Sequence, residues 1–394
     1  MNDNDVVVVA ALRSPLGKRN GGLSTIHPAD LLGTIQRACI EQAGIDPGEI
    51  EQVLAGCVGQ VGEQSSNIAR TAWLAAGLPV ATPGSTVDAQ CGSSQQAFNL
   101  AAALVGSGAC DAVMACGVES MSRVPLGSNV RNGPGRAISD SYFSRFQFTN
   151  QFEGAELIAN KWGISRDDCD RFGLQSQQRA ALAWAEGAFD REVVPLDAPN
   201  LDAEGAPDGT THTVARDEGL RETSLETLAT LKPVVANDGV HTAGSSSQIT
   251  DGAAAVILMT ARRAAELGAP QRARVRAQCL VGTDPVLMLT GPIDATQACL
   301  KRSGATMDDI GTVEINEAFA SVVLAWERET AGVDMERVNP NGGAIALGHP
   351  LGATGVRLVT TALHNLERLD EDLALVTMCC GGGLGTGTVL ERIG

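Results

Sequence analysis

The last third of this 394-residue chain repeats the order of elements found in its first third. Two pairs of segments correspond, 49–56 with 309–316 and 112–119 with 373–385. In each copy a turn opens a helix, at Cys91 in the first copy and at His349 in the second. A duplication of roughly 120 residues predicts two similar α/β halves related by a pseudo-twofold axis. The turns at Cys91 and His349 would then converge on one site.

The rest of the chain predicts how these halves are divided. Strand-like stretches rich in β-branched residues alternate with helical ones, which favours a layered α/β fold. Between 121 and 247 arginines, glycines, prolines and acidic residues replace that alternation, which indicates an inserted domain over the active-site face. We expect a first half of 1–120 with 248–270, an inserted loop domain of 121–247, and a second half of 271–394.

The composition is that of a globular protein, with 44% hydrophobic and 19% charged residues. The net charge of −17 argues against nucleic acid or an anionic membrane as a partner, because either would attract a basic face. The acidic start at 1–5 does not resemble a secretion signal, and no apolar run approaches membrane-spanning length. Residues 391–394 are not a peroxisomal address. We therefore expect a cytoplasmic protein without a membrane or nucleic-acid partner.

The first reactive candidate is Cys91, which follows a strand and begins a helix. The first N–H groups of a helix are unpaired and its dipole is positive there, so this position favours a thiolate. An ordinary cysteine has a pKa near 8.5, and even a depression of about one unit would raise its reactivity at neutral pH. The plainer interpretation is a structural cysteine at a helix start.

The ten cysteines do not indicate a metal site. The sequence has no CxxC pair, and Cys379 and Cys380 are immediate neighbours, which is poor geometry for zinc. Most of the others lie in apolar runs and are interpreted as small buried residues in a reducing compartment. We expect no metal.

Three late motifs supply further candidates. His349 lies in a glycine-framed turn before Pro350, a residue suited to a helix start; Cys379 ends an apolar strand before three glycines; Asn316 stands where a strand meets a helix. Each has a plainer interpretation as well: a solvated or capping histidine, a core cysteine, and an N-cap asparagine. The glycine run does not have the GxGxxG spacing and no helix follows it, so we reject a dinucleotide site.

Together these motifs resemble the thiolase family in order and rough spacing over essentially the whole chain. The shared stretches are Arg13-Ser-Pro, Asp88-Ala-Gln-Cys91, Asp251-Gly-Ala-Ala-Ala, Asn316-Glu-Ala-Phe-Ala, Gly348-His-Pro-Leu-Gly-Ala-Thr-Gly and Cys379-Cys-Gly-Gly-Gly. The resemblance implies a thiolase-like five-layer αβαβα fold, built from two duplicated halves with an inserted loop domain. It also implies assembly as a homodimer or homotetramer.

The resemblance assigns roles to five residues. Cys91 matches the nucleophile that takes the acyl group, and His349 the histidine that activates it and contributes to an oxyanion hole. Asn316 matches the asparagine that holds a water in that hole. Cys379 matches the acid/base that exchanges a proton with C2 of the acetyl unit. The backbone N–H groups of Cys91 and Gly381 match a second oxyanion hole.

The same resemblance implies acyl-CoA and CoA as substrates, with CoA a co-substrate and no permanently bound cofactor. Ser247 matches a serine near the pantetheine, and Arg221 an arginine near the nucleotide; their plainer interpretation is a loop serine and an exposed arginine. The implied reaction cleaves 3-ketoacyl-CoA with CoA to acetyl-CoA and a shortened acyl-CoA. It is reversible and ping-pong through acyl-Cys91, and belongs to the β-oxidation of a fatty acid or sterol side chain.

Other functions remain open at this point. One is a biosynthetic acetoacetyl-CoA acetyltransferase. Another is a ketoacyl synthase of the same fold, which would not have the second cysteine that this chain has in Cys379. A hydrolase would use water in place of CoA. A non-catalytic acyl-CoA or sterol carrier would not need all of Cys91, His349, Asn316 and Cys379.

Two departures from the family pattern bear on the substrate. The usual Asn-Ala-Ser-Gly reads Ser245-Ser-Ser-Gln248 here, which changes the expected pantetheine contacts. The usual Met-Gly-x-Thr-Ala-Glu near the acyl pocket reads Gln151-Phe-Glu-Gly-Ala-Glu156. With His241-Thr-Ala-Gly and the Cys91 motif, these stretches look most like actinobacterial thiolases of sterol side-chain degradation. We expect a pocket for an acyl group other than a short linear one.

Overall fold

A computed structural model describes residues 2–131, 134–235 and 238–393. In this part of the chain the strand order of one half repeats in the other. The N-terminal half has the order β1-β8-β5-β3-β4, and the C-terminal half the order β9-β12-β11-β10. The N-terminal strands are β1 (Val6–Arg13), β3 (Gln52–Gly56), β4 (Gly84–Val87), β5 (Ala112–Ser120) and β8 (Thr250–Thr260); the C-terminal strands are β9 (Ala273–Gly282), β10 (Thr312–Ile315), β11 (Leu373–Cys380) and β12 (Leu384–Arg392).

Strand directions repeat along with strand order. In the first half β3 and β5 are parallel and β8 runs antiparallel to both β5 and β1. In the second half β10 and β11 are parallel and β12 runs antiparallel to both β11 and β9. The halves meet through a short antiparallel pairing of Val7 and Val8 with Arg274 and Ala273. The duplication expected from the sequence is confirmed.

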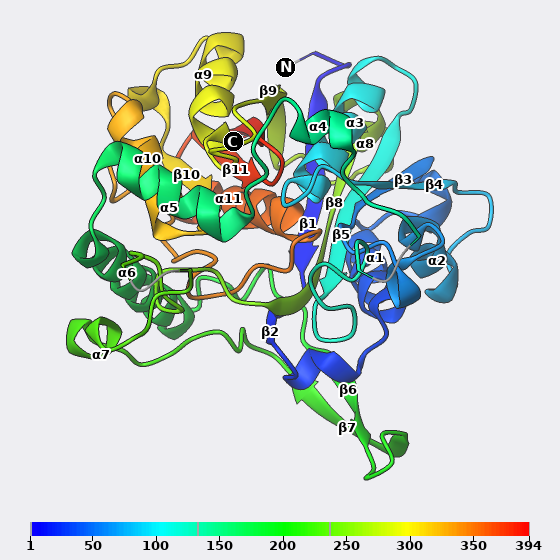
Figure 1. The fold of residues 1–394 in the computed structure, drawn as a ribbon. Coiled ribbons are helices and arrows are strands. Elements are labelled where there is room, and N and C mark those ends of the chain that lie inside the picture. The colour runs from blue at the N-terminus through cyan, green and yellow to red at the C-terminus, as the bar shows by residue number, and fades with distance from the viewer. Residues whose placement is uncertain (1, 132–133, 236–237, 394) are drawn as a thin grey trace.

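The helices complete a five-layer arrangement (Figure 1). Helices α1 (Pro28–Ala43) and α2 (Ile68–Ala75) cover the outer face of the N-terminal strands, and α9 (Gly291–Ser303) and α10 (Ala320–Glu329) the outer face of the C-terminal half. Helices α3 (Ser93–Gly106) and α11 (Thr354–Leu369) touch each other and strands of both halves. They therefore form the middle layer, and Figure 1 shows α11 at the centre of the molecule.

The position of α11 in the middle layer explains why this helix is so thoroughly buried. Every residue from Thr354 to Leu366 is buried, although Thr, Arg, His and Asn stand among the aliphatic residues. A helix that packs on several sides is buried all round rather than along one stripe. Val359 and Leu363 of α11 join Phe98 of α3 and strand residues of both halves in one core.

The segment between the two parts of the N-terminal half folds outside these layers. It contains α4 (Asp140–Phe143), α5 (Gln151–Trp162), α6 (Arg166–Ala185), α7 (Leu225–Ala229) and the hairpin of β6 (Leu196–Leu201) with β7 (Pro207–Val214). Helices α5 and α6 pack against α10, whereas the hairpin projects away from the layers (Figure 1). We propose the division into 1–120 with 248–270, 121–247 and 271–394, which the repeated strand order supports.

Some sequence predictions of local structure were wrong in detail. The helix expected to open at Pro350 begins at Thr354, because residues 350–353 form a turn first. Helix α3 begins at Ser93, so Cys91 lies just before the helix rather than in it. The short strand β2 (Gly17–Lys18), helix α8 (Ala261–Leu267) and the remaining short turns connect the main elements.

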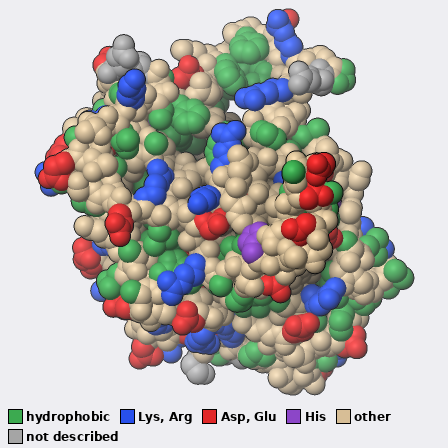
Figure 2. Space-filling model, turned by 90° about the horizontal axis from the view of Figure 1, so that it is seen from below, with side chains coloured by type: hydrophobic (Ala, Val, Ile, Leu, Met, Phe, Trp, Pro, Cys, Tyr) green, Lys and Arg blue, Asp and Glu red, His purple; other side chains and the backbone are tan. Residues whose placement is uncertain are grey.

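The surface offers acidic and basic side chains in a mixed pattern. Over the face seen in Figure 2, Lys and Arg are interspersed with Asp and Glu rather than gathered into one field. None of the helices in the described ranges has the length and apolar character needed to cross a bilayer.

Candidate active site

The turn before α3 is shaped to present Cys91. Gln90 adopts a positive φ of 54°, and the side chain of Asp88 accepts a hydrogen bond of 2.8 Å from its backbone N–H. The Ser93 hydroxyl closes the turn, since it accepts from the N–H of Ala89 at 3.0 Å and donates to the carbonyl of Gln90. The chain thus leaves β4, reverses tightly, and places Cys91 two residues before the first residue of α3.

The surroundings of Cys91 both desolvate its thiol and offer it donors. Burial raises its pKa to about 11, opposed by hydrogen bonds from the backbone N–H groups of Gly381 and of Cys91 itself. The carboxylates of Glu119 and Asp88 raise the pKa further. The prediction that the helix start lowers the pKa of Cys91 was wrong, because burial of the thiol outweighs the hydrogen bonds from the backbone N–H groups. The thiol therefore needs a base at the moment of reaction.

His349 is held as a neutral imidazole. Its Nδ1 lies 2.6 Å from the hydroxyl of Thr354, and that hydroxyl donates at 2.9 Å to the carbonyl of Pro350. A hydroxyl has a single proton, so Thr354 accepts from Nδ1–H, and the lone pair is on Nε2. Burial, and then the charge of Arg357, lower the pKa of His349 to about 3. Nε2 is thus a proton acceptor at neutral pH.

Asn316 connects the histidine to the second cysteine. Its Nδ2 lies 3.4 Å from Nε2 of His349 and 3.9 Å from Sγ of Cys379. Its Oδ1 is buried without a hydrogen-bond partner among the described residues, so it can accept one from a bound molecule. The N-cap interpretation was wrong, because α10 begins at Ala320 with Phe319 as its N-cap.

Cys379 lies at the end of β11, near Cys91. Its pKa is raised by burial and then by the neighbouring Cys91, against hydrogen bonds from Asn316 and from the backbone N–H groups of Cys379 and Ala318. Gly381 follows this strand and directs its N–H toward Cys91. The structure thus brings Cys91, His349, Asn316, Cys379 and Gly381 together from both halves.

The two residues predicted near CoA lie at different distances from this cluster. Ser247 is half-buried, and its N–H donates at 2.9 Å to the carbonyl of Ala318, next to the donor for Cys379. Arg221 is exposed, its N–H donates to Gln177 at 2.9 Å, and its side chain extends toward the carbonyl of Ala243. The structure therefore joins Ser247 to the site and leaves Arg221 on the surface.

Both departures from the family pattern lie next to the site. The amide nitrogen of Gln248 donates to the carbonyls of Gly219 at 2.7 Å and Ile345 at 2.9 Å, so this glutamine joins the loop before Arg221 to the chain before His349. The ring of Phe152 is edge-on to Phe319, with centroids 5.4 Å apart.

Sequence reasoning missed several buried polar residues around His349. Thr354, which orients the imidazole, stands five positions beyond it, and Glu119 and Glu317 contact the same loop. A signal existed for Glu119, because it is a charged residue within the otherwise apolar strand β5. Glu317 follows Asn316 directly and could have been noticed for the same reason.

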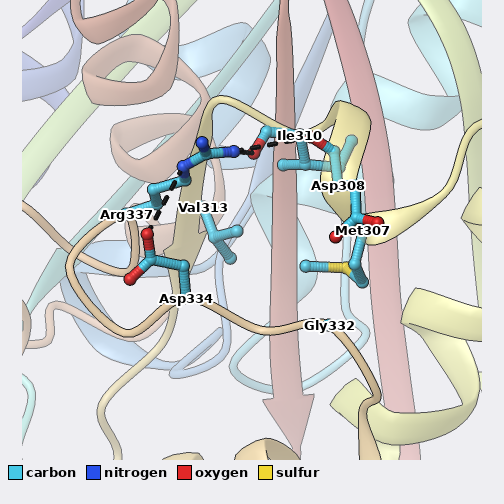
Figure 3. Close-up of a pocket in the computed structure, with 7 residues that line it drawn as sticks. All are labelled: Met307, Asp308, Ile310, Val313, Gly332, Asp334 and Arg337. Atoms are coloured by element: carbon cyan, nitrogen blue, oxygen red, sulfur yellow. Dashed lines mark hydrogen bonds and ion pairs between the residues drawn. The ribbon is translucent and has the colours of Figure 1, made fainter.

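A separate pocket of about 270 Å³ opens beside the loop at 332–337 (Figure 3). Its walls are Met307, Asp308, Ile310, Val313, Gly332, Asp334 and Arg337. Arg337 points across one side toward Asp334 and the backbone of Ile310 (Figure 3). None of the five clustered residues lines this pocket.

Comparison with known proteins agrees with the arrangement. Residues 6–262 match the model of the thiolase N-terminal domain, and residues 269–392 match that of the thiolase C-terminal domain. Among curated relatives, the steroid 3-ketoacyl-CoA thiolase FadA6 of Mycobacterium tuberculosis is 45% identical over 99% of this chain and 94% of its own length. A 3-ketoacyl-CoA thiolase of Bacillus subtilis is 40% identical, over 98% of this chain and 99% of its own.

Solved structures show the same fold. The acetyl-CoA acetyltransferase of Bacillus anthracis superposes with a TM-score of 0.89 at 33% identity. The human mitochondrial 3-ketoacyl-CoA thiolase does so with 0.88 at 33% identity; each match covers 99% of both chains. With both halves matched and the predicted site residues gathered between them, this chain belongs to the thiolase family.

Proposed function

We propose that this protein cleaves 3-ketoacyl-CoA with CoA, releasing acetyl-CoA and a shortened acyl-CoA in β-oxidation. The observation that supports this most directly is the meeting of Cys91 and Cys379 with the neutral imidazole of His349, around the amide of Asn316. A synthase or a hydrolase would have no use for the second thiol. A carrier would have no use for the base.

In the first half-reaction, Nε2 of His349 takes the proton of Cys91, and the thiolate attacks the keto carbon. The bond between that carbon and C2 then breaks, and the thioester enolate of acetyl-CoA leaves. Cys379 gives its proton to C2. The high pKa of both thiols suits this order, since each sulfur stays protonated until a partner takes its proton.

In the second half-reaction, the thiol of CoA gives its proton to Cys379 and attacks acyl-Cys91. The tetrahedral intermediate collapses, and Cys91 leaves as a thiol after recovering the proton from His349. Both halves build negative charge on oxygen. Asn316 with His349, and the N–H groups of Cys91 and Gly381, can donate hydrogen bonds to that oxygen. Each such donor typically stabilises the transition state by about 3–4 kcal/mol.

The acyl group that fits best is a bulky one, such as a steroid-bearing or branched chain. Phe152, where the usual family pattern has a glycine, is 36% exposed and packs against Phe319 of the segment that follows Asn316. Phe319 lies in turn against His241, with ring centroids 5.4 Å apart. We expect Phe152, the exposed member of this aromatic group, to present rigid apolar surface to the acyl group. The name of the steroid-thiolase relative points in the same direction.

The CoA contacts and the assembly follow as parts of the same proposal. Ser247 would meet the pantetheine and Arg221 the nucleotide, with CoA entering under the inserted segment. The active form would be a homodimer or homotetramer in the cytoplasm, with no metal and no permanently bound cofactor.

The test is a panel of 3-ketoacyl-CoA substrates, followed by loss of the enolate absorbance with and without CoA. We expect turnover that requires free CoA and favours branched or steroid-bearing substrates over acetoacetyl-CoA. Equal rates without CoA would indicate a hydrolase. A strong preference for acetoacetyl-CoA would contradict the bulky-acyl proposal while leaving the thiolase reaction intact.

A further inference from the structure

The loop around His349 lies between the two halves. Two buried carboxylates accept hydrogen bonds from its backbone, one before His349 and one after it. We propose that Glu119 and Glu317 are positioning residues that fix His349 relative to Cys91 and Asn316, an inference that rests on the proposed function. Glu119 belongs to the N-terminal half and contacts the chain after His349. Glu317 belongs to the C-terminal half and contacts the chain before it.

Glu119 is the penultimate residue of β5 and is 2% exposed. Its Oε2 accepts from the N–H of Gly352 and from that of Val58, each at 2.9 Å. Its Oε1 accepts from the N–H of Gly59 at 2.9 Å and from the side-chain amide of Gln64 at 2.7 Å. Both oxygens therefore face donors, which is the environment of an acceptor-only, ionised carboxylate. This one side chain joins the N-terminal loop at Val58 to the turn that follows His349.

Glu317 is 1% exposed and follows Asn316 directly. Its Oε2 accepts from the hydroxyl of Ser176 at 2.6 Å and from the N–H of Ile345 at 3.1 Å. Its Oε1 accepts from the amide of Asn339 at 2.9 Å. The residue beside Asn316 thus holds the chain four residues before His349, and so sets the distance between the amide and the imidazole.

The loop is built to let both carboxylates approach. A Cβ at Gly352 would lie 2.8 Å from Oε2 of Glu119 and 2.6 Å from the Cα of Cys57. A Cβ at Gly343 would lie 2.2 Å from the carboxyl carbon of Glu317. Real side chains do not tolerate such distances, so each glycine makes room for one carboxylate. His349 is therefore flanked by two close contacts that are specific in geometry.

The contacts of Glu119 and those of Glu317 have different consequences for the reaction. Loss of the Glu119 contacts frees the His349 turn from the half that contains Cys91, which slows removal of the Cys91 proton. Loss of the Glu317 contacts separates His349 from Asn316, which weakens the shared oxyanion hole. A displacement of about 1 Å at a reacting group can cost about 10²-fold in rate.

The test uses Glu119→Gln and Glu317→Gln. Each variant keeps the shape of the side chain but replaces one carboxylate oxygen, an acceptor, by an NH2 group, which is a donor and would face other donors. The matched control is Asp251→Asn. Asp251 is equally buried and accepts at 2.8 Å from the N–H of Ser122 through Oδ1, while its Oδ2 has no partner among the described residues. Three quantities are measured: the rate of Cys91 acylation from a simple acyl-CoA, the rate of 3-ketoacyl-CoA cleavage, and the thermal midpoint.

We expect Glu119→Gln to slow acylation and cleavage alike by about 10²-fold with KM little changed. Glu317→Gln should slow cleavage far more than acylation, and Asp251→Asn should keep both rates. The proposal is overturned if both glutamine variants keep wild-type rates, or if all three variants lose rate only in proportion to their loss of folded protein. Should the wild type itself form no acyl-enzyme, the proposed function has failed instead.

If Glu317→Gln does not fold, a milder variant, Ser176→Ala, tests the same contact. Ser176→Ala removes one hydrogen bond to Glu317 and one from the N–H of Gly343, which donates to the Ser176 hydroxyl at 3.2 Å. Ser176 lies in the inserted segment, outside the cluster at Cys91. A smaller fall in cleavage with acylation unchanged would support the proposal, and unchanged cleavage would contradict the part assigned to Glu317.

Discussion

The amide nitrogen of Asn316 lies 3.4 Å from Nε2 of His349, and the same nitrogen lies 3.9 Å from the sulfur of Cys379. One side chain therefore touches the base for the first thiol and the second thiol itself. Because Thr354 fixes the tautomer of His349, the amide meets a lone pair rather than a competing donor. Substitutions at these positions should separate the two half-reactions.

Cys91→Ser should abolish formation of the acyl-enzyme. A serine hydroxyl is far less acidic than a thiol, and this buried site already raises the pKa of the thiol to about 11. Intact-protein mass spectrometry after mixing with acyl-CoA should show the added acyl mass on the wild type and none on the variant. Acylation of the variant to the same extent would remove Cys91 from its assigned role.

Cys379→Ser should still accept an acyl group on Cys91 from a simple acyl-CoA. Cleavage of 3-ketoacyl-CoA should fall by about 10²- to 10⁴-fold, the usual contribution of a positioned acid or base. The measurement compares acyl-enzyme burst and steady-state cleavage in the same preparation. If cleavage stayed normal, the proton at C2 would have to come from elsewhere.

Asn316→Ala should lower cleavage by about 10²- to 10³-fold, as loss of one oxyanion donor does. The thermal midpoint should change little, because the amide oxygen of Asn316 has no partner among the described residues and the nitrogen makes only long contacts. The two measurements together distinguish a chemical defect from a folding defect. A large loss of stability without a specific loss of rate would contradict this assignment.

Much of the site could be predicted because each residue sits in a local pattern. Cys91, His349 and Cys379 each stand at a turn beside a strand or helix, and glycines mark two of the turns. The internal repeat then predicts that the turns at Cys91 and His349 meet. The first feature depends on short stretches of sequence and the second on the order of elements along the chain, and the structure agrees with both.

The remainder depends on contacts that no short stretch contains. Glu119 and Gly352 are 233 positions apart, and their hydrogen bond exists only after the halves have packed together. The raised pKa of Cys91 has the same origin, because burial in the folded protein outweighs the backbone N–H groups of Gly381 and Cys91, which lower the pKa. The turn after His349 likewise extends to Ala353 before α11 begins, although Pro350 had suggested an earlier helix start.

The pKa of His349 predicts how stability depends on pH. Burial and Arg357 lower that pKa from 6.5 to about 3, so the folded protein keeps the imidazole neutral where the unfolded chain binds a proton. Above about pH 6.5 neither state is protonated at this site and it contributes nothing to the pH dependence. Below that value the unfolded state binds more protons, so stability falls as the pH falls toward about 3.

His349→Gln removes this proton uptake and keeps a polar side chain of similar size. The thermal midpoint of the wild type should therefore fall more steeply than that of His349→Gln between about pH 7 and about pH 4.5. All other titrating groups are common to both proteins, so the difference between the two curves isolates His349. Parallel curves over this range would mean that the folded protein protonates His349 as readily as the unfolded chain does, and that the imidazole is not held as a neutral base.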